Sequence, residues 1–533
     1  MLCASAVSVV GKSEPRRDKA LFEAPLAGPS PKQPAGKKTL RVALFLFKAN
    51  GCVRTKPTPA CTIFGDDKCT KIAIKTRAEI LGGVAMTSML YPTTNPSAAE
   101  QMVVARGEGP YIYDRSGKRY LEGMAGLWCT SLGYGNEEII EVATQQMREL
   151  SFSHMFGGKT HDSAMMLADK LAAMVPMKNA RVFLGNSGSD ANDTLVKMIR
   201  YHATATGQPQ RTKIIARDKG YHGVTVASAS LTGIPTNHNH FQLPFDALGV
   251  IRTGSPHFYR SANPGESEAE FVARRASELE EQIVAAGPET VAAMIAEPVS
   301  GAGGVLIPPT GYYEAIQAVL DKYGIALWDD EVICGFGRLG TDFGANAMGM
   351  RPEMMVFAKA LSSAYVPVSA AVVSSDFVEA VESAASDMGV FGHGYTYSGH
   401  PLGCAVAHKV LEIYERDNVF EHAAQVGEYL QERLSAFSDH PMVGEVSGKG
   451  MIGALELVAN KATAQPFEGM AVGQYCAKAA EAAGLIVRPL GGNRVALCPP
   501  LILQREHVDE LIDKLTIAVN ATLDFAKQEQ LLA

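Results

Sequence analysis

Short apolar runs alternate with helical stretches through the middle of this chain, and this alternation restricts the possible fold more than any other feature. The runs occupy residues 181–185, 213–218, 291–299, 324–332, 354–359 and 368–375. Stretches with helical periodicity, such as residues 194–207 and 311–324, lie between them. This order predicts an α/β fold with right-handed crossovers and a mostly parallel sheet that is buried on both faces.

The regions on either side of this pattern predict a second, smaller α+β domain. Residues 109–126 hold two short apolar runs around the turn DRSGK, which is typical of a hairpin, and residues 137–175 have helical periodicity. After about residue 410, long helices precede short strands and a last helix that begins near residue 505. We therefore expect a small domain from residues 89–150 and 411–533, and a large domain from residues 151–410.

The first 88 residues differ from the rest of the chain. Residues 1–85 hold 15 Lys and Arg against 6 Asp and Glu, whereas the remaining residues are net acidic. Because the segment is rich in breakers and has no sustained period, we expect an extension that is disordered or not native. Translation from Met86 or Met89 is one hypothesis, and a targeting peptide or a small regulatory tail are the alternatives.

Composition argues against several classes of protein. A net charge of −7 is unusual for a general nucleic-acid binder. The longest apolar run near the N-terminus is VALFLF, far short of the roughly 20 residues that cross a bilayer. Nine cysteines without a tight pairing pattern indicate reduced thiols. We expect a cytoplasmic protein with no metal and with neither nucleic acid nor membrane as a partner.

One lysine, Lys359, lies in the run VFAKALSS, which otherwise holds only apolar and small residues. A lysine in this setting can snorkel, with its methylenes buried and its ammonium in water. Alternatively, burial lowers the pKa of the amine, which then forms a Schiff base. The octapeptide alone leaves both interpretations open.

Polar residues also follow other predicted strands. Ser187, Gly188 and Ser189 follow the run at 181–185 and open a helix, where free N–H groups and the helix dipole favour phosphate. The alternative is a capping turn with Asp190 in the first helical turn. Tyr221 and His222 follow the run at 213–218, and Glu297 lies near the end of the run at 291–299. An aromatic ring here stacks on a cofactor or packs on the sheet edge.

The stretch WDDEV ends another predicted strand. Because side chains alternate along a strand, Asp329 and Glu331 should share one face while Asp330 points to the other. A pyridoxal phosphate enzyme needs one such carboxylate against the ring nitrogen, and a solvated loop acid is the alternative. Ligands bind at the carboxyl ends of parallel strands, so the phosphate turn, Asp330 and Lys359 should meet there. Together they favour the Schiff-base lysine.

The ordered motifs NSGSDAND, YHG, EPVSGAGG, DEVICGFGR, AKALSS and HGYTYSGHP resemble those of the class III aminotransferases, pyridoxal phosphate enzymes of fold type I. The resemblance runs from about residue 95 to residue 525. It implies pyridoxal 5′-phosphate as the cofactor and a large domain with a mostly parallel, seven-stranded sheet. It also implies a homodimer with shared active sites, or a tetramer.

The resemblance assigns roles by position. It implies that Lys359 forms the Schiff base and moves the proton of the reaction. The implied cofactor contacts are Ser187, Gly188 and Ser189 at the phosphate, Tyr221 and Val332 on the two faces of the ring, His222 beside them, Glu297 near the cofactor hydroxyl, Asp330 at the ring nitrogen, and Thr396 at the phosphate of the partner subunit's cofactor.

Within this class the chain is most similar to the ω-amino acid or amine:pyruvate aminotransferases. Trp128 matches a pocket-lining tryptophan, and Arg488 matches an arginine that pairs with the keto acid carboxylate, as guanidinium geometry permits. A surface arginine near a turn is the alternative for Arg488. The sequence departs from the family pattern at four positions: Asp190 replaces a glutamate, Ala360 and Ala364 replace glycines, and Asp329 replaces a small or apolar residue.

We therefore predict an enzyme that transfers an amino group from an ω-amino acid or primary amine to a keto acid such as pyruvate. An aminomutase, racemase or decarboxylase on the same scaffold is the first alternative. A cofactor-binding regulator without catalysis is the second. The motifs are compatible with β-alanine, 4-aminobutyrate, taurine, a diamine or an aryl-alkyl amine as the donor.

Overall fold

The computed structural model describes residues 89–94 and 102–533. The prediction of an extension over residues 1–88 lies outside the described residues. Residues 99–533 form one compact unit, and the account below concerns this unit. The predicted division at residues 150 and 410 therefore stays a prediction.

A seven-stranded sheet forms the centre of this unit, in the order β4-β10-β9-β8-β7-β5-β6. Its strands are β4 (Arg181–Gly185), β5 (Lys213–Arg217), β6 (Val250–Thr253), β7 (Val291–Ala296), β8 (Ala326–Asp330), β9 (Met354–Phe357) and β10 (Ser369–Val373). The pairs from β6 to β9 are parallel, whereas β10 pairs antiparallel with both β9 and β4. The predicted mostly parallel sheet of an α/β fold is confirmed.

The strand β6 was not expected from the sequence. It holds only four residues, VIRT, and three of them are half-buried. An edge strand with a charged residue in its middle gives neither a continuous apolar run nor a regular alternation. Its parallel pairing with β5 places it at one end of the sheet.

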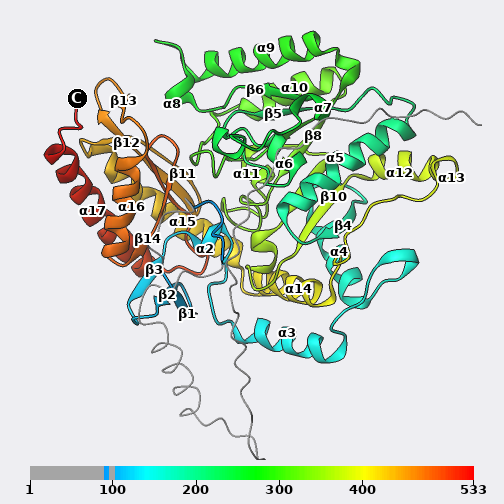
Figure 1. Ribbon diagram of the computed structural model, residues 1–533, viewed down its shortest axis with the longest axis horizontal. Coiled ribbons are helices and arrows are strands. Elements are labelled where there is room, and N and C mark those ends of the chain that lie inside the picture. The colour runs from blue at the N-terminus through cyan, green and yellow to red at the C-terminus, as the bar shows by residue number, and fades with distance from the viewer. Residues whose placement is uncertain (1–88, 95–101) are drawn as a thin grey trace, which may run out of the picture. The chain divides into compact units, whose positions relative to one another are not determined.

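Helices cover both faces of this sheet, because its strands are apolar on both sides. On one face, α5 (Gly188–Ala205) packs against alternate strand residues that include Trp328 and Val356. On the other face, α4 (Asp162–Met174), α10 (Tyr312–Lys322) and α14 (Pro401–Arg416) pack against residues that include Leu327 and Phe357 (Figure 1). Residues next to each other on β8 therefore lie in different layers.

Two smaller sheets accompany the main sheet. The first has the order β1-β2-β3-β14, from β1 (Val104–Glu108), β2 (Tyr111–Asp114), β3 (Arg119–Glu122) and β14 (Leu485–Ile486). The second has the order β11-β12-β16-β15, from β11 (Val443–Lys449), β12 (Ile452–Asn460), β15 (Arg488–Leu490) and β16 (Arg494–Leu497), with β13 (Gln465–Pro466) beside β12. The antiparallel pair β2 and β3 confirms the predicted hairpin, and the parallel pair β3 and β14 joins distant parts of the chain.

The ends of several helices follow from local sequence. Ser187 and Ser267 each accept a hydrogen bond from the third helical amide and so form capping boxes at α5 and α9 (Glu268–Ala286). Pro401 occupies the first position of α14, where its missing N–H costs nothing. The predicted last helix is confirmed as α17 (Arg505–Gln528), which packs against α16 (Ala471–Ala482).

The remaining helices are short segments or lie on the surface. They are α2 (Ala125–Trp128), α3 (Glu137–Glu149), η1 (Phe156–Gly158), α6 (Val226–Leu231), η2 (Pro235–Asn237), α7 (Phe245–Leu248), α8 (Phe258–Ser261), η3 (Pro288–Thr290), α11 (Gly344–Met348), η4 (Lys359–Ser362), α12 (Ser375–Ser383), α13 (Ala385–Met388), α15 (Val419–Ser435) and η5 (Ala436–Asp439).

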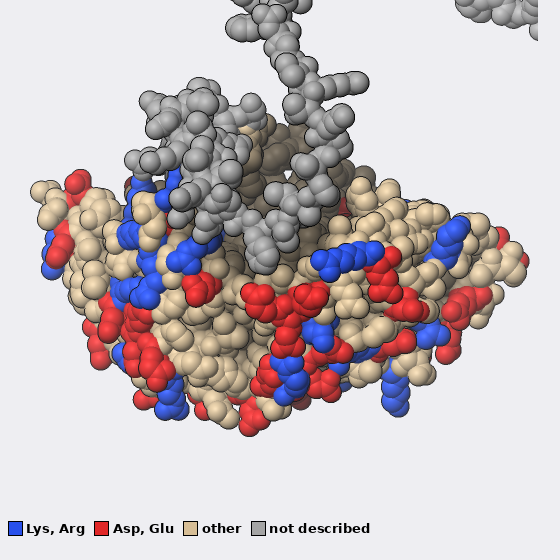
Figure 2. Space-filling model, turned by 90° about the horizontal axis from the view of Figure 1, so that it is seen from below, with Lys and Arg blue, Asp and Glu red and all other residues tan. Residues whose placement is uncertain are grey.

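Within the part of the chain that the structure describes, none of the helices has the length and apolar character that a membrane span requires. Acidic and basic side chains are mixed over the face shown in Figure 2. Some of them form exposed ion pairs, such as Arg416 with Glu138 at 2.7 Å. Exposed ion pairs of this kind add little to stability, because each contributes only about 0–1 kcal/mol.

Candidate active site

Most predicted site residues lie at one edge of the main sheet, directly after the carboxyl ends of its strands. Ser187, Gly188 and Ser189 follow β4, Tyr221 and His222 follow β5, Glu297 follows β7, Asp330 and Val332 end and follow β8, and Lys359 follows β9. These strand ends lie along one edge of the sheet, where ligands of such folds bind, and the roles of the residues stay predictions.

Asp330 is held by contacts to both of its carboxylate oxygens. Its Oδ2 lies 2.8 Å from Nδ1 of His222 and accepts a hydrogen bond from Nδ2 of Asn192 at 3.0 Å. Its Oδ1 accepts the amide of Val332 at 3.2 Å, and the side chain is only 2 % exposed. The carboxylate is thus fixed in one orientation by groups from three different elements.

Asn192 was missed by sequence reasoning, although a signal existed. It lies on α5 four residues after Gly188, so the two residues share one face of the helix. Its Nδ2 also donates to the carbonyl oxygen of His222 at 2.6 Å. Asn192 therefore ties the helix that carries the phosphate turn to the loop that carries His222 and to Asp330.

Lys359 opens η4 with a left-handed backbone, φ 48°. Its side chain is half-buried and makes no hydrogen bond to another described residue. Burial lowers the pKa of its amine, and the charge of Asp330 acts in the opposite direction. An amine whose neutral form is favoured by burial is a nucleophile and a base, which is the alternative to snorkelling raised by the sequence.

Hydrogen bonds from other parts of the chain fix the loop after Lys359. Ala364 has φ 61°, a conformation that costs an L-residue about 1–2 kcal/mol and that glycine adopts freely. The hydroxyl of Tyr414 donates to the Ala360 carbonyl at 2.7 Å, and the amide of Leu132 donates to Oγ of Ser363 at 2.9 Å. These contacts fix the loop although alanines occupy the positions where the family has glycines.

The turn before α5 fits both interpretations offered by its sequence. Oγ of Ser187 accepts the amide of Asp190 at 3.2 Å, and the Asp190 carboxylate accepts the amide of Ser187 at 3.0 Å, so the turn is a capping box. The amides of Gly188 and Ser189 lie in the first helical turn, where N–H groups have no intrahelical partner. An anion at this helix end is favoured by those donors and by the dipole.

Gly188 and Val332 approach each other closely. A Cβ atom at Gly188 would lie 3.0 Å from Cγ2 of Val332, so only glycine fits here without a shift. Oγ of Ser189 accepts the amide of Val224 at 3.1 Å, which ties the turn to the loop after Tyr221. The phosphate turn and the residue predicted on one face of the ring are therefore neighbours.

Glu297 organises the loops after β5 and β7. Its Oε1 accepts the amide of Tyr221 at 2.9 Å, and its Oε2 accepts the amide of Gly301 at 2.9 Å. The side chain is only 2 % exposed, and burial raises the pKa of its carboxyl group while His222 lowers it. Tyr221 is half-buried beside these groups, and burial raises the pKa of its phenol.

Arg488, on β15, lies close enough to Tyr221 for the two charges to interact. The side chain is half-buried, and burial lowers the pKa of its guanidinium group. None of the ion pairs or side-chain hydrogen bonds among residues 102–533 involves this guanidinium. A half-buried cation without a carboxylate partner fits the predicted contact with a substrate carboxylate.

The two other predicted residues lie in different settings. Trp128, at the end of α2, is only 2 % exposed and belongs to an apolar cluster with Val299, Ile333 and Leu490. Thr396 is exposed in a turn after β10 and has no hydrogen bond to the other predicted residues within this chain. The prediction for Thr396 concerns a partner subunit, so one chain does not test it.

Pyridoxal phosphate fits the residues present. The amine of Lys359 makes no hydrogen bond to another described residue, the amides of Gly188 and Ser189 lack intrahelical acceptors, and Asp330 is held in a fixed orientation. These groups match an aldehyde, a phosphate and a ring nitrogen in turn. They would hold the cofactor between Val332 and Tyr221, as the sequence predicts.

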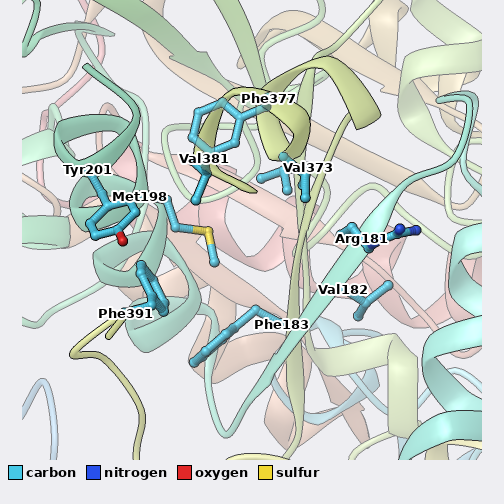
Figure 3. A pocket seen from close by; sticks show the side chains of 10 residues that line it. Arg181, Val182, Phe183, Met198, Tyr201, Val373, Phe377, Val381 and Phe391 are labelled. Carbon is cyan, nitrogen blue, oxygen red and sulfur yellow. The ribbon is translucent and has the colours of Figure 1, made fainter. Parts of the chain in front are cut away.

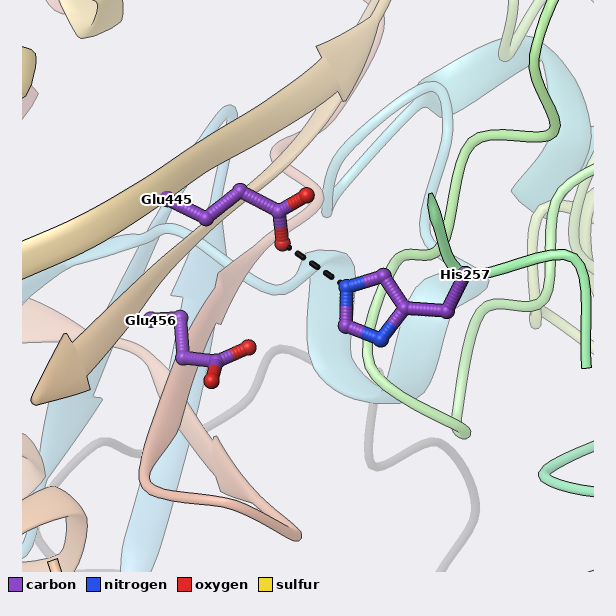
Figure 4. A group of neighbouring side chains, drawn as sticks. All are labelled: His257, Glu445 and Glu456. Atoms are coloured by element: carbon purple, nitrogen blue, oxygen red, sulfur yellow. Dashed lines mark hydrogen bonds and ion pairs between the residues drawn. The ribbon is translucent and has the colours of Figure 1, made fainter. Parts of the chain in front are cut away.

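A second group of potential ligands lies elsewhere, formed by His257, Glu445 and Glu456 (Figure 4). Nε2 of His257 lies 2.9 Å from Oε2 of Glu445. The buried Arg494 contacts both glutamates, at 2.5 Å for Glu445, and Arg260 donates to Glu456 at 2.5 Å. Because cations of the protein already pair with both carboxylates, we interpret this group as an ion network that joins β11, β12 and β16.

An apolar cavity of about 220 Å³ lies beside the edge strand β4 (Figure 3). Phe183 from β4, Met198 and Tyr201 from α5, and Phe377 and Val381 from α12 line it. None of the predicted site residues borders this cavity. Its lining is apolar, so it offers few groups that could orient a polar substrate.

The fold and the cluster at the sheet edge define a pyridoxal phosphate enzyme of fold type I. The profile of the aminotransferase class-III family matches residues 93–519. The chain belongs to this family.

Curated relatives and solved structures that resemble this chain are transaminases as well. A gamma aminobutyrate transaminase 3 from Solanum lycopersicum, described as chloroplastic, is 45% identical over 439 residues, which cover 81% of this chain and 84% of the relative. A mitochondrial gamma-aminobutyrate transaminase 1 from Oryza sativa subsp. japonica is 44% identical, with 79% and 81% covered. An omega transaminase from Pseudomonas jessenii in complex with PMP has a TM-score of 0.80 and 45% identity, with 82% and 97% covered. The predicted class III aminotransferase, its cofactor and its reaction type are confirmed.

Proposed function

We propose that this aminotransferase uses pyruvate or a similarly small keto acid as acceptor, with Arg488 binding the acceptor carboxylate. The half-buried guanidinium of Arg488 pairs with no carboxylate of the described chain, and its charge acts on Tyr221. This observation carries the proposal. A guanidinium and a carboxylate form paired, charge-assisted hydrogen bonds. Such a contact selects acceptors that carry a carboxylate next to the reacting carbonyl.

The proposed roles of the other residues follow from their bonds. Lys359 would bind the cofactor and, once displaced by the amine substrate, move the proton as base and acid. Asp330 would keep the ring nitrogen charged, and His222 and Asn192 would hold its carboxylate in place. When bound, pyridoxal phosphate supplies an electron sink for negative charge at the substrate carbon.

We propose that Trp128 limits the bulk of the amine donor. One solved relative is a thermostable omega transaminase variant in which a tryptophan is replaced, engineered for asymmetric synthesis of enantiopure bulky amines. Two curated relatives are gamma-aminobutyrate transaminases. Both facts favour donors that carry a primary amine on a short chain, and a Trp128→Ala variant should accept bulkier ones.

A homodimer with shared active sites is also part of the proposal. Thr396 and Tyr397 are exposed in one turn, and Phe152, which packs edge-on against Tyr397 at 5.8 Å, is 41% exposed. Exposed aromatic residues that pack on each other are typical of an interface between subunits. We expect Thr396→Ala to weaken cofactor binding roughly tenfold, the size of one lost bond to a charged group, with Thr204→Ala as the control. Sedimentation of the holoenzyme as a monomer would contradict the dimer.

The first experiment is an absorbance spectrum of the purified holoenzyme before and after an amine is added without a keto acid. Loss of the visible cofactor band and growth of a near-ultraviolet band indicate a stable half-reaction. An Arg488→Gln variant should keep this half-reaction with a simple amine and raise the KM for pyruvate by roughly tenfold or more. The exposed Arg106→Gln is the control. An unchanged KM in Arg488→Gln would refute the acceptor proposal.

Location in the cell also stays a proposal. The composition favours the cytoplasm, whereas the plant relatives named above are described as chloroplastic or mitochondrial. Fractionation of cells that express the natural gene, followed by detection of the intact chain, would test it.

A further inference from the structure

The segment that carries Trp128 has an unusual backbone. Ala125, Gly126 and Trp128 have φ values of 44°, 66° and 66°, in the left-handed region. A non-glycine residue there costs about 1–2 kcal/mol, and a bulky residue such as tryptophan is a clear outlier. Such a conformation persists only where the surroundings determine it. The question is which groups hold this turn, Ala125–Trp128, in place.

Backbone hydrogen bonds hold the two ends of the turn. The amide of Cys498 donates to the carbonyl of Gly123 at 2.7 Å, and the amide of Leu501 donates to the carbonyl of Ser131 at 2.8 Å. Both donors come from the segment that follows β16. These bonds fix where the turn enters and leaves. Inside it, the amides of Trp128 and Cys129 donate to the carbonyls of Met124 and Ala125, at 2.8 and 2.9 Å. These backbone bonds close the turn on itself, and a side chain is needed to tie it to β3.

Glu122, the last residue of β3, supplies a side chain of this kind. Its Oε1 accepts the amide of Met124 at 3.1 Å, and the amide of Gly126 also acts on the carboxylate. Its Oε2 lies 3.5 Å from the hydroxyl of Tyr134. The side chain is only 2 % exposed and pairs with no cation among the described residues. Burying a carboxylate without a cation costs free energy of folding. Its hydrogen bonds to the turn offset part of that cost.

We propose that Glu122 is a positioning residue whose carboxylate holds the Ala125–Trp128 turn and thereby sets the space that Trp128 leaves for the amine donor. The part of this proposal that concerns the donor rests on the proposed role of Trp128. The part that concerns the turn rests on the contacts above alone. Nothing in this proposal requires Glu122 to touch the substrate.

The ionisation of Glu122 supplies an independent readout. Burial raises the pKa of its carboxyl to about 7, while the amides of Met124 and Gly126 and the Tyr134 hydroxyl lower it. The other titratable groups around it are the thiols of Cys129 and Cys498, and burial raises the pKa of both. These neighbours stay neutral near pH 7, so the carboxylate and its hold on the turn weaken as the pH falls from 8 to 6.

The fluorescence of Trp128 reports the turn directly. The chain has two tryptophans, and the other, Trp328, is buried with an indole nitrogen that has no hydrogen-bond partner. Trp328→Phe removes an unsatisfied polar group and leaves Trp128 as the only tryptophan. The experiment measures acrylamide quenching of the Trp328→Phe holoenzyme with and without Glu122→Gln, at pH 8 and pH 6. Thermal unfolding and cofactor content are recorded for each variant.

We expect quenching of Trp128 to be weak at pH 8 in the parent and to rise at pH 6. Glu122→Gln should raise quenching at both pH values and remove the dependence on pH. The ratio of kcat/KM for a bulky aryl-alkyl amine over 4-aminobutyrate should rise roughly tenfold in Glu122→Gln, the effect of one hydrogen bond to a charged group. The KM for pyruvate should change less than this ratio, because neither of these contacts of the Glu122 carboxylate is with Arg488, although Glu122 pairs with Ile486 two residues before it.

The matched control is Tyr134→Phe. It removes the hydroxyl near Oε2 and leaves the bond from Met124 to Oε1, so quenching should match the parent. Gly126→Ala disturbs the turn and leaves the Glu122 side chain itself unchanged. A Cβ there has room, with its nearest neighbour at 3.5 Å, but the backbone conformation is unfavourable. It should change quenching and the donor ratio in the same direction as Glu122→Gln.

Quenching and donor ratio that both match the parent in Glu122→Gln would overturn the proposal. If Glu122→Gln does not fold, the test uses the Trp328→Phe parent alone. Equal quenching of Trp128 at pH 6 and pH 8 in this parent would also overturn the proposal. The role of Trp128 is judged separately by Trp128→Ala. An unchanged donor ratio in that variant would refute the proposed donor pocket, while the quenching result still judges whether Glu122 holds the turn.

Discussion

The end of β8 and the residue after it carry three carboxyl groups in a row, on two faces whose surroundings differ sharply. Asp330 points to the face covered by α5 and takes part in three hydrogen-bond contacts. Asp329 points to the opposite face and is fully buried. Among the described residues neither of its oxygens accepts a hydrogen bond from an amide or a cation, and the Glu331 carboxyl group acts on it instead. Burial is equal on the two faces. What distinguishes a carboxylate equipped for chemistry is therefore the set of groups that hold its charge, not its depth.

We call the side covered by α5 the front face and the opposite side the rear face. Glu331 lies on the rear face with Asp329 and has a structural role. Its two oxygens accept the amides of Gly344 and Ala345, at 3.0 and 2.7 Å, at the beginning of α11. Burial and the two neighbouring carboxylates raise the pKa of Asp329 well above its usual range, and burial raises that of Glu331 to about 7. We expect the rear pair to hold a proton near neutral pH, while the front carboxylate stays bonded to His222.

The largest effect on turnover should come from a substitution at the catalytic lysine, Lys359. Lys359→Ala removes the amine that binds the cofactor and moves the proton, and steady-state turnover should fall below detection although both rear acids remain. Transamination assays with pyruvate and an amine donor measure it. Lys197→Ala, on the surface of α5, is the control and should keep full turnover. Steady-state turnover retained by Lys359→Ala would refute the assignment of the catalytic lysine.

Asp330→Asn should have the next largest effect. The amide keeps the size of the side chain but removes the negative charge that faces the site, and loss of one such electrostatic contact lowers kcat by roughly 10²–10³-fold. Unfolding temperature should also fall, because asparagine has one acceptor oxygen, whereas Asn192 and the Val332 amide donate to different oxygens of Asp330. The kcat values are therefore compared per bound cofactor. The comparison of the faces would fail if Asp329→Asn lowered kcat as much as Asp330→Asn.

Glu331→Ala should act on stability instead of chemistry. It leaves the amides of Gly344 and Ala345 buried without an acceptor, and each unsatisfied group costs about 1–3 kcal/mol. Urea unfolding of the holoenzyme would measure the loss, and kcat per bound cofactor should fall less than in Asp330→Asn. A variant as stable as the parent would show that Glu331 does not hold α11.

The smallest effect should appear in Asp329→Asn, through pH. A carboxyl group whose pKa is raised on folding binds more protons in the folded state, so stability falls as the pH rises from the unfolded pKa near 4 toward the folded one. Asparagine does not titrate. Between pH 5 and pH 8 the variant should therefore lose less stability than the parent, by about 1 kcal/mol or more. Equal pH dependence of the two proteins in urea unfolding would contradict the protonated rear pair.

Sequence patterns predicted the front face better than the rear. The alternation along WDDEV separated Asp330 from Asp329 and Glu331, and the positions of Tyr221, Glu297 and Lys359 followed from the rule that sites form at strand ends. Asn192 escaped prediction because its partner, Asp330, lies 138 residues away in the chain. The bonds of Glu331 to Gly344 and Ala345 escaped for the same reason, since they depend on where the loop after β8 returns.

The fold class was predicted from periodicity, but the edges of the sheet were not. β6 is short and half-buried, so its sequence differs little from that of a loop. The left-handed conformation at Trp128 and Ala364 could not be read from residue type, because tryptophan and alanine rarely adopt it. Tertiary contacts determine both, and single-sequence patterns do not contain them.

The antiparallel strand β10 also has a consequence for the order in which the protein is made. β4 lies at the edge of the main sheet and pairs only with β10. Gly185 therefore has its strand partner only after Ser369 has been synthesised. Oγ of Ser369 also donates to the Asp190 carboxylate at 2.9 Å, within the turn that would bind phosphate. During synthesis from the N-terminus, this turn leaves the ribosome long before its supporting strand exists. The phosphate cradle is thus encoded early and completed late, and a nascent chain that ends before β10 should not retain the cofactor.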